Sequence, residues 1–212
     1  MPANETIILY HAPQSRSSAT LTLLEELGAP YELHVLNMKA GEQRQPAYLA
    51  INPMGKVPAI THNGALITEQ VAISLYLADL FPQAGLTPAI GDPRRGPYLR
   101  WFVFYAACFE PAAVDKAMQR DSGGQSMSPY GDFETVLNTL FAQLAPGPYL
   151  LGDRPTAADV LWGSALRWMT MFKLVPERPE VMAYVKRMGE RPAAVRAREK
   201  DAALAATQAA GT

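Results

Sequence analysis

The spacing of apolar positions switches between strand-like and helix-like periodicity several times along the first third of the chain. Residues 6–11, TIILYH, are β-rich and mostly apolar, as in a buried strand. A helix is predicted next, because Leu21 and Leu24 recur at helical spacing and Gly28 is placed to end it. Residues 31–36, YELHVL, then alternate like a second strand. Strand, helix and strand in close succession predict a βαβ unit with parallel strands.

The next segment predicts a hairpin and a buried helix. After a polar stretch with a short helix around residues 47–51, Asn63 and Gly64 lie between two short apolar runs. Both residues tolerate the positive φ of a type I′ turn, so the third and fourth strands are expected to be antiparallel. The predicted helix at residues 69–81 is apolar almost all round, so it must be covered on more than one side.

Residues 82–97 mark a break in composition, with four prolines and three glycines. Beyond it the pattern predicts helices and no convincing strand, at residues 94–119, 130–145, 156–172, 179–190 and 192–207. The chain therefore reads as α/β plus all-α: an α/β domain at residues 1–82, a linker at 83–93 and an all-helical domain at 94–212.

One helix start in the second half carries a capping signal. Thr156 precedes an apolar run and is followed three residues later by Asp159, a variant of the capping box. Loss of such a cap typically costs about 1 kcal/mol, so this pair is expected to matter for folding rather than for catalysis.

Composition and charge narrow the function classes. The 212 residues are 49% hydrophobic with a net charge of −1, and no basic stripe points to nucleic acid. The longest apolar run, Trp101 to Phe109, is too short to span a bilayer, and no export signal is recognisable. A single cysteine, Cys108, excludes an internal disulfide, and three scattered histidines make no metal spacing. We expect a soluble cytoplasmic protein without a metal, a membrane partner or a nucleic-acid partner.

Three serines, Ser15, Ser17 and Ser18, follow Pro13 where the first strand gives way to the first helix. A serine at this place is either the N-cap of the helix, accepting a hydrogen bond from a backbone N–H, or a hydroxyl that holds a reactive group of a substrate. The residues alone leave both interpretations open.

The motifs NPMGKVPAI, TEQVAISLYLADLFP and DRPTAADVLWGSAL, in this order over nearly the whole chain, resemble the cytosolic glutathione transferase family, in its bacterial, serine-type form with a theta-like active-site motif. The resemblance implies a thioredoxin-like N-terminal domain of order βαβαββα and a homodimer. It also implies glutathione as co-substrate and an apolar second-substrate site at the domain cleft.

The resemblance assigns the glutathione site to five residues of the N-terminal domain. Pro58 matches the family's cis proline, which positions the backbone of Val57 to pair with the cysteinyl part of glutathione. Glu69 would accept from the α-amino group, and the backbone N–H of Gln70 would bind the neighbouring carboxylate. Gln70 stands where the family has serine or threonine, and Lys56 is a candidate for the glycyl carboxylate.

The thiol-activating hydroxyl of the family falls on Ser15, with Ser17 as the alternative. No cysteine stands at the start of the first helix, which disfavours mixed-disulfide chemistry. The candidates for the second-substrate pocket are Pro13, Phe104, Tyr105, Cys108 and Trp168.

The first functional hypothesis is a glutathione transferase that conjugates the glutathione thiolate to small apolar electrophiles, with a role in detoxification. The alternative is a non-catalytic ligand- or partner-binding protein on the same fold, and the departure at Gln70 favours it. A glutathione-dependent isomerase ranks lower, because that branch carries Ser-Ser-Cys where this chain has SRSS.

Overall fold

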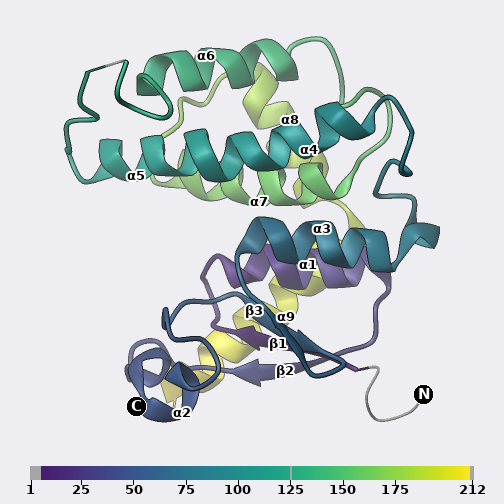
Figure 1. The fold of residues 1–212 in the computed structure, drawn as a ribbon, viewed down its shortest axis with the longest axis vertical. Helices are drawn as coiled ribbons and strands as arrows, with labels where there is room; N and C mark the ends of the chain where they lie inside the picture. Colours follow the sequence, from purple (N-terminus) through teal and green to yellow (C-terminus); the bar gives the residue numbers. More distant parts are fainter. Residues whose placement is uncertain (1–5, 125, 211–212) are drawn as a thin grey trace. The chain divides into compact units, whose positions relative to one another are not determined.

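The computed structural model describes residues 6–124 and 126–210, so the outermost residues of the two predicted domains lie outside the described part. The chain divides into two compact units (Figure 1). The first contains the described residues up to Ala84 together with those from Glu190 onward, and the second is Gly85–Gly189.

The first unit is built on a four-stranded sheet of order β2-β1-β3-β4. Its strands are β1 (Ile7–His11), β2 (Tyr31–Val35), β3 (Ala59–His62) and β4 (Ala65–Ile67). β1 runs parallel to β2, as the predicted βαβ unit requires, and it runs antiparallel to β3. The hairpin prediction is confirmed in detail, since Asn63 has φ 51° and Gly64 has φ 78° between the antiparallel strands.

Two long helices, α1 (Ser17–Leu27) and α3 (Gln70–Leu80), lie side by side over one face of this sheet (Figure 1). Ile7 and Leu9 are fully buried. The next residue of β1, Tyr10, points to the opposite face, because strand side chains alternate. There it packs in a smaller core with Tyr48 of the short helix α2 (Pro46–Leu49), which follows the 3-10 turn η1 (Glu42–Arg44). The predicted order βαβαββα is confirmed.

The last helix, α9 (Pro192–Ala210), packs along α1 and belongs to the first unit. The sequence assigned residues 192–207 to the helical domain, because helical periodicity does not reveal the partner of a helix. Buried alanines of α9 and ion pairs accompany the observed packing. Arg191 on the approach to α9 forms a bidentate pair with Glu26 at 2.5 and 2.6 Å, and Glu25 accepts from Arg196 at 2.9 Å and from Lys200 at 2.6 Å.

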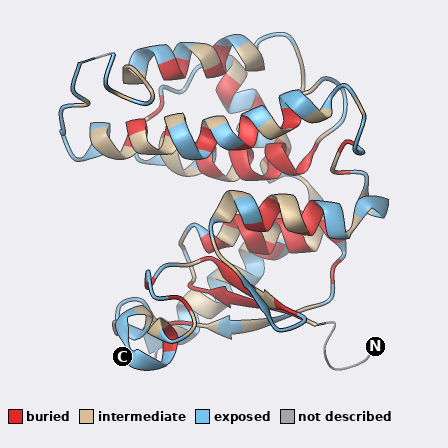
Figure 2. Ribbon diagram, in the orientation of Figure 1, coloured by how far each residue is buried: buried red, intermediate tan, exposed pale blue. Residues whose placement is uncertain are grey.

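The second unit is helical. It contains α4 (Arg95–Phe104), η3 (Tyr105–Phe109), α5 (Glu110–Ala117), α6 (Phe133–Leu144), α7 (Ala157–Met171) and α8 (Pro179–Gly189), after a short turn, η2 (Pro82–Ala84), that closes the first part of the other unit. Its core surrounds Trp162, which is fully buried, contacts Trp101 and Phe109, and donates its indole N–H to the Trp101 carbonyl at 3.1 Å. Figure 2 marks much of α7 as buried.

The single helix predicted at residues 94–119 is interrupted by η3, a π-helical turn. Pro111 at the start of α5 provides the physical reason, since proline has no N–H and its ring clashes with the carbonyl four residues earlier. A π turn takes up this conflict without ending the helical path. The periodicity of apolar positions continues through the turn, so the sequence pattern gave no sign of it.

The capping box predicted at Thr156 is present, with Asp159 accepting from the Thr156 N–H at 2.7 Å and from its hydroxyl at 2.8 Å. Asp159 is fully buried and also accepts from the Leu150 N–H at 2.8 Å and the Tyr184 hydroxyl at 2.9 Å. It therefore joins α7 to the loop before it and to α8.

Within residues 6–124 and 126–210, no helix combines the length and apolar character needed to cross a membrane. The same residues contain no group of three or more His, Cys, Asp or Glu side chains arranged to hold a metal ion.

Candidate active site

The serine junction lies between β1 and α1. Gln14 has φ 55°, a left-handed conformation that is uncommon for a residue other than glycine and turns the chain sharply after Pro13. Arg16 is the N-cap of α1 and makes no side-chain capping bond. The Ser18 N–H instead bonds the Ser15 carbonyl at 3.1 Å, so the serines lie in the first turn and directly before it.

Ser15 and Ser17 differ in their access to solvent. Ser15 is partly exposed, and its hydroxyl donates to the Ala12 carbonyl at 2.7 Å and accepts from the Ser17 N–H at 3.2 Å. Ser17 is fully buried, and its hydroxyl accepts from the Ala12 N–H at 3.1 Å. The two hydroxyl oxygens are 2.8 Å apart. Of the two serine candidates, Ser15 is therefore the one whose hydroxyl a ligand could reach.

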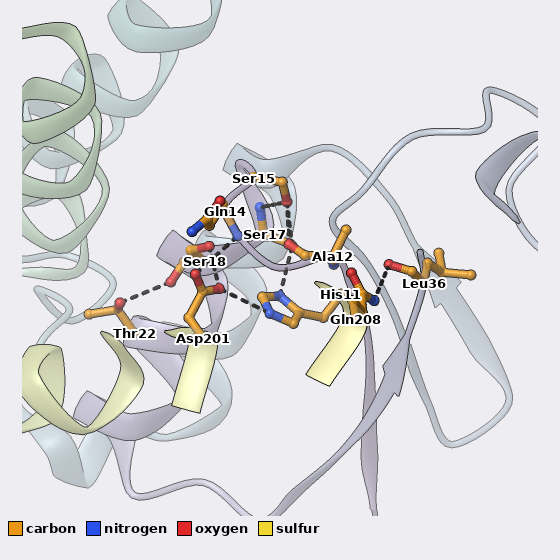
Figure 3. A network of polar contacts seen from close by, with 10 residues as sticks. All are labelled: His11, Ala12, Gln14, Ser15, Ser17, Ser18, Thr22, Leu36, Asp201 and Gln208. Atoms are coloured by element: carbon orange, nitrogen blue, oxygen red, sulfur yellow. Dashed lines mark hydrogen bonds and ion pairs between the residues drawn. The ribbon is translucent and has the colours of Figure 1, made fainter. Parts of the chain in front are cut away.

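Behind Ser17 lies a buried histidine (Figure 3). The Ser17 hydroxyl oxygen is 2.8 Å from Nδ1 of His11, whose side chain is fully buried at the end of β1. Nε2 of the same ring is 3.1 Å from Oδ1 of Asp201 on α9, an ion-pair contact without the angle of a directed hydrogen bond. The junction is therefore braced from the C-terminal helix of the chain.

Asp201 is itself fixed by the junction. It accepts from the Ser18 hydroxyl at 2.7 Å and from the Gln14 N–H at 3.0 Å. Burial alone would raise the pKa of Asp201, but its interactions with His11, Ser18 and the Gln14 N–H outweigh burial and lower that pKa below its usual range. The carboxylate is therefore ionised at neutral pH.

The predicted glutathione residues before β3 form a braced loop. The Val57–Pro58 peptide bond is cis, which is the isomer implied by the resemblance. The carbonyl of Lys56 accepts from the Tyr48 hydroxyl at 2.7 Å and from the Asn52 amide at 2.9 Å. The Lys56 side chain is exposed and Val57 is half-buried.

Gly55 is required in this loop. It has φ 58°, and a Cβ at its position would lie 2.7 Å from the carbonyl oxygen of Gln43, closer than real Cβ atoms come. The close approach of the two backbone segments fixes the loop just ahead of Lys56.

Glu69 and Gln70 stand at the N-terminus of α3. Glu69 is exposed and has φ 64° and ψ 113°, a strained conformation of the kind that collects at ligand sites. The backbone N–H of Gln70 belongs to the first turn, where N–H groups have no intrahelical acceptor. The Gln70 side chain donates from Nε2 to the Arg16 carbonyl at 2.9 Å.

These contacts bring the predicted residues of the first unit together. Gln70 ties the start of α3 to the start of α1, and Tyr10 pairs with Ala59, so the Val57–Pro58 bond approaches the same edge of the sheet as the serine junction. A partly exposed hydroxyl, two helix N-termini and a braced loop thus gather at one edge of the sheet. This arrangement suits an extended anionic ligand.

The predicted pocket residues of the second unit lie in more than one place: Phe104 and Tyr105 contact Trp162, whereas Trp168 stacks on Phe172. Tyr105 is buried against Trp162, with ring centroids 5.4 Å apart, so it is part of the core. Phe104 and Cys108 are half-buried on η3 and the helix before it, and burial raises the pKa of the Cys108 thiol. Trp168 is also half-buried and stacks on Phe172 at 5.6 Å. In the first unit, Pro13 is half-buried at the serine junction.

A hollow of about 350 Å³ in the second unit is lined by none of these predicted residues. It lies between the segments around Thr87 and Arg154. The apolar second-substrate site therefore stays a prediction.

Sequence reasoning missed His11 and Asp201 as parts of the site. His11 appeared only as one of three scattered histidines, and Asp201 is one of two acids on the helix predicted at residues 192–207. Only the packing of α9 on α1 brings the two together, and the charged residues of α9 that face α1 were the available signal for that packing.

Comparisons with known proteins show the family of the chain. Residues 5–79 match the family described as "Glutathione S-transferase, N-terminal domain", and residues 130–192 match "Glutathione S-transferase, C-terminal domain". The chain is 29% identical over 187 residues to glutathione S-transferase GstA of Escherichia coli O157:H7, covering 87% of this chain and 93% of that protein. It is 32% identical over 168 residues to a glutathione S-transferase of Xanthomonas campestris pv. campestris, covering 76% of this chain and 81% of that one.

Solved structures give the same result. A glutathione transferase from Methylococcus capsulatus superposes with a TM-score of 0.77 at 29% identity, covering 92% of this chain and 98% of that one. A sphingomonad glutathione S-transferase complexed with glutathione superposes with a TM-score of 0.77 at 27% identity and the same coverage.

Proposed function

Because the chain belongs to the glutathione S-transferase family and is a glutathione transferase, we propose that it conjugates the glutathione thiolate to small apolar electrophiles, with Ser15 as the hydroxyl that stabilises the thiolate. One observation carries the assignment of Ser15. Ser15 is partly exposed at the edge of the sheet where the Val57–Pro58 loop and the start of α3 meet, whereas Ser17 is fully buried.

In the proposed complex, glutathione lies along this edge. Glu69 accepts from the α-amino group, and the N–H of Gln70 binds the adjacent carboxylate at the positive end of α3. The backbone of Val57 pairs with the cysteinyl part as an added strand would. Lys56, whose side chain is exposed, pairs with the glycyl carboxylate.

Lowering the pKa of the glutathione thiol requires a modest free energy from the Ser15 hydroxyl. The pKa of a free thiol is about 8.5. Lowering that pKa by about two units requires about 2.7 kcal/mol of preference for the thiolate. A hydrogen bond from a hydroxyl to a charged sulfur contributes about 1.5–3 kcal/mol. The nearby N-terminus of α1 adds about 0.3–1 kcal/mol. Ser15 thus acts as a donor to sulfur and not as a nucleophile.

A non-catalytic binding protein is the weaker candidate. Its support was the carboxamide of Gln70 in place of a hydroxyl. That carboxamide is directed to the Arg16 carbonyl, which leaves the backbone N–H of Gln70 to serve the ligand as in the proposed complex. The half-exposed Ser15 gives the site a group with a catalytic use.

We further propose a cytoplasmic homodimer in which the α/β domain of one chain packs on the helical domain of the other. Light scattering at micromolar concentration is expected to give twice the chain mass of 23.1 kDa. A stable species at 23.1 kDa would contradict the dimer.

The function is tested in two steps. The protein is expected to be retained on immobilised glutathione, to elute with free glutathione, and to conjugate glutathione to an electron-poor aryl halide faster than the uncatalysed reaction. Retention without conjugation across a panel of apolar electrophiles would favour the binding protein. Absence of retention would contradict the glutathione site itself.

A further inference from the structure

A continuous row of polar atoms runs from the partly exposed Ser15 into the protein (Figure 3). The hydroxyl oxygens of Ser15 and Ser17 are 2.8 Å apart, and the Ser17 oxygen is 2.8 Å from Nδ1 of His11. Nε2 of His11 is in turn 3.1 Å from a carboxylate oxygen of Asp201. The row therefore ends at a carboxylate supplied by the far end of the chain.

Asp201 determines where the imidazole carries its proton. The carboxylate is ionised, since the pKa of Asp201 is lowered by its contacts with His11, Ser18 and the Gln14 N–H despite the opposing effect of burial. A carboxylate facing Nε2 favours the tautomer with the proton on Nε2 and stabilises the imidazolium. Nδ1 is then an acceptor, and the Ser17 hydroxyl donates to it.

In the described part of the chain, Asp201 is the charged side chain seen in contact with the His11 imidazole. His11 meets Asp201 from α9 and Ser17 from α1, and its strand neighbour Val35 is apolar. The ring is fully buried, so a proton that arrives at Nδ1 comes through the Ser17 hydroxyl and not from solvent.

We propose that His11 accepts the proton of the bound glutathione thiol, relayed through Ser15 and Ser17. The inference rests on the proposed function, in which the thiol lies against Ser15. Without glutathione the Ser15 hydroxyl donates to the Ala12 carbonyl, and in the relay it turns to the Ser17 oxygen 2.8 Å away. The S–H bond breaks as an O–H bond forms on Ser15, the Ser15 proton passes to Ser17, and the Ser17 proton passes to Nδ1. No oxidant or further reactant is needed, and the products are a thiolate and an imidazolium.

The relay leaves every hydroxyl oriented toward the sulfur. Nδ1–H donates to Ser17, Ser17 donates to Ser15, and Ser15 donates to the thiolate. The new imidazolium lies between two anions, the thiolate and Asp201. His11 touches no substrate, so it is a positioning residue that acts through Ser17 and Ser15.

A purely structural role for these contacts, as a clamp between α9 and α1, makes a different prediction. Lys200 offers a matched control, since it precedes Asp201 on α9 and clamps the same helix pair by donating to Glu25 at 2.6 Å. Lys200→Met weakens the clamp without touching the row of polar atoms. Asp201→Asn weakens the clamp and also removes the charge that stabilises the imidazolium.

The test follows the histidine ring nitrogens by ¹⁵N NMR at about pH 8, where an ordinary imidazole is neutral. Adding glutathione to the wild-type protein is expected to convert one histidine to the doubly protonated form, whereas S-methylglutathione, which has no thiol proton, leaves it neutral. His11→Asn identifies the signal by its loss, and the signals of His34 and His62 serve as internal references. If all three rings stay neutral with glutathione bound, the relay is contradicted.

Thiolate absorbance against pH gives a second readout that does not depend on His11→Asn folding. Asp201→Asn is expected to raise the pKa of the bound thiol by about one unit, while Lys200→Met leaves it unchanged. Equal shifts in the two variants would overturn the relay in favour of the clamp. Ser15→Ala separates the two proposals: if it raises the thiol pKa and Asp201→Asn does not, the relay fails and Ser15 keeps its role. If glutathione does not bind the wild-type protein, the proposed function fails first.

Discussion

The carboxamide of Gln70, at the first position of α3, donates to the carbonyl of Arg16 at 2.9 Å, and so joins the helix that would hold the γ-glutamyl end of glutathione to the helix that begins at the serines. Since Arg16 lies between Ser15 and Ser17, this bond also links the proposed thiol-activating hydroxyl of Ser15 to the helix start next to Glu69. The residue that departs from the family pattern therefore has a structural use at the same site.

Gln70→Ala is expected to weaken glutathione binding by about 0.5–1.5 kcal/mol, the usual net value of one such hydrogen bond, with the fold retained. Isothermal calorimetry measures the change. Gln83→Ala, in the short turn after α3, is the matched control and is expected to bind normally. An unchanged affinity in Gln70→Ala would mean that the bond to Arg16 does not organise the site.

Glu69→Gln removes the charge of the proposed partner of the α-amino group and keeps the shape of the side chain. A charge-assisted hydrogen bond contributes about 1.5–3 kcal/mol, so glutathione affinity is expected to fall roughly ten- to a hundredfold. Glu32→Gln, an exposed acid on β2, controls for net charge. Equal affinities for the two variants would remove Glu69 from the site.

Asp159→Asn is expected to lower the free energy of unfolding by about 2–4 kcal/mol, because an amide N–H₂ would replace one of two oxygens that together accept four hydrogen bonds. Denaturant titration measures the loss, and the exposed Asp153→Asn is the control. A loss within the error of the control would mean that the capping box contributes little to stability.

The Glu25 cluster predicts a pH dependence of stability. Burial tends to raise the pKa of Glu25, but hydrogen bonds from Lys200, Tyr31 and Arg196 lower it from 4.5 to about 2. A carboxyl whose pKa is lower in the folded state contributes stability above its unfolded pKa, and this contribution is lost as the pH falls. The wild-type advantage over Glu25→Gln is therefore expected to be complete above pH 4.5 and to shrink toward pH 2.

That pH dependence is checked by denaturant titrations of both proteins across the same pH range. Glu177→Gln, which removes an exposed acid of the second unit, is the reference for a general effect of charge. A difference between wild type and Glu25→Gln that stays constant across the range would contradict the lowered pKa.

Several elements of both units were predictable from sequence because each carries a local signal. Asn63-Gly64 specifies its turn, Gly28 ends α1 with φ 60°, and Thr156 with Asp159 specifies the start of α7 in the second unit. These signals depend on backbone preferences over a few residues, which the sequence displays directly.

Other features depend on contacts between distant residues and were not predictable. The packing of α9 on α1 includes charge pairs such as Arg191 with Glu26, and one sequence does not indicate which acid meets which base. The same holds for His11 and Asp201, whose contact exists only after α9 has docked. The assignment of five glutathione residues came from the resemblance, and their grouping at one sheet edge is what the structure adds.

The measurement that tests the account most directly is the pKa of the thiol of bound glutathione, followed by thiolate absorbance against pH in the wild-type protein, Ser15→Ala and Ser15→Thr. Ser15→Ala is expected to raise the thiol pKa toward the free value of about 8.5 while glutathione stays bound. Ser15→Thr keeps the hydroxyl and is expected to retain a low thiol pKa. A low thiol pKa in Ser15→Ala would contradict the central claim that the Ser15 hydroxyl stabilises the thiolate.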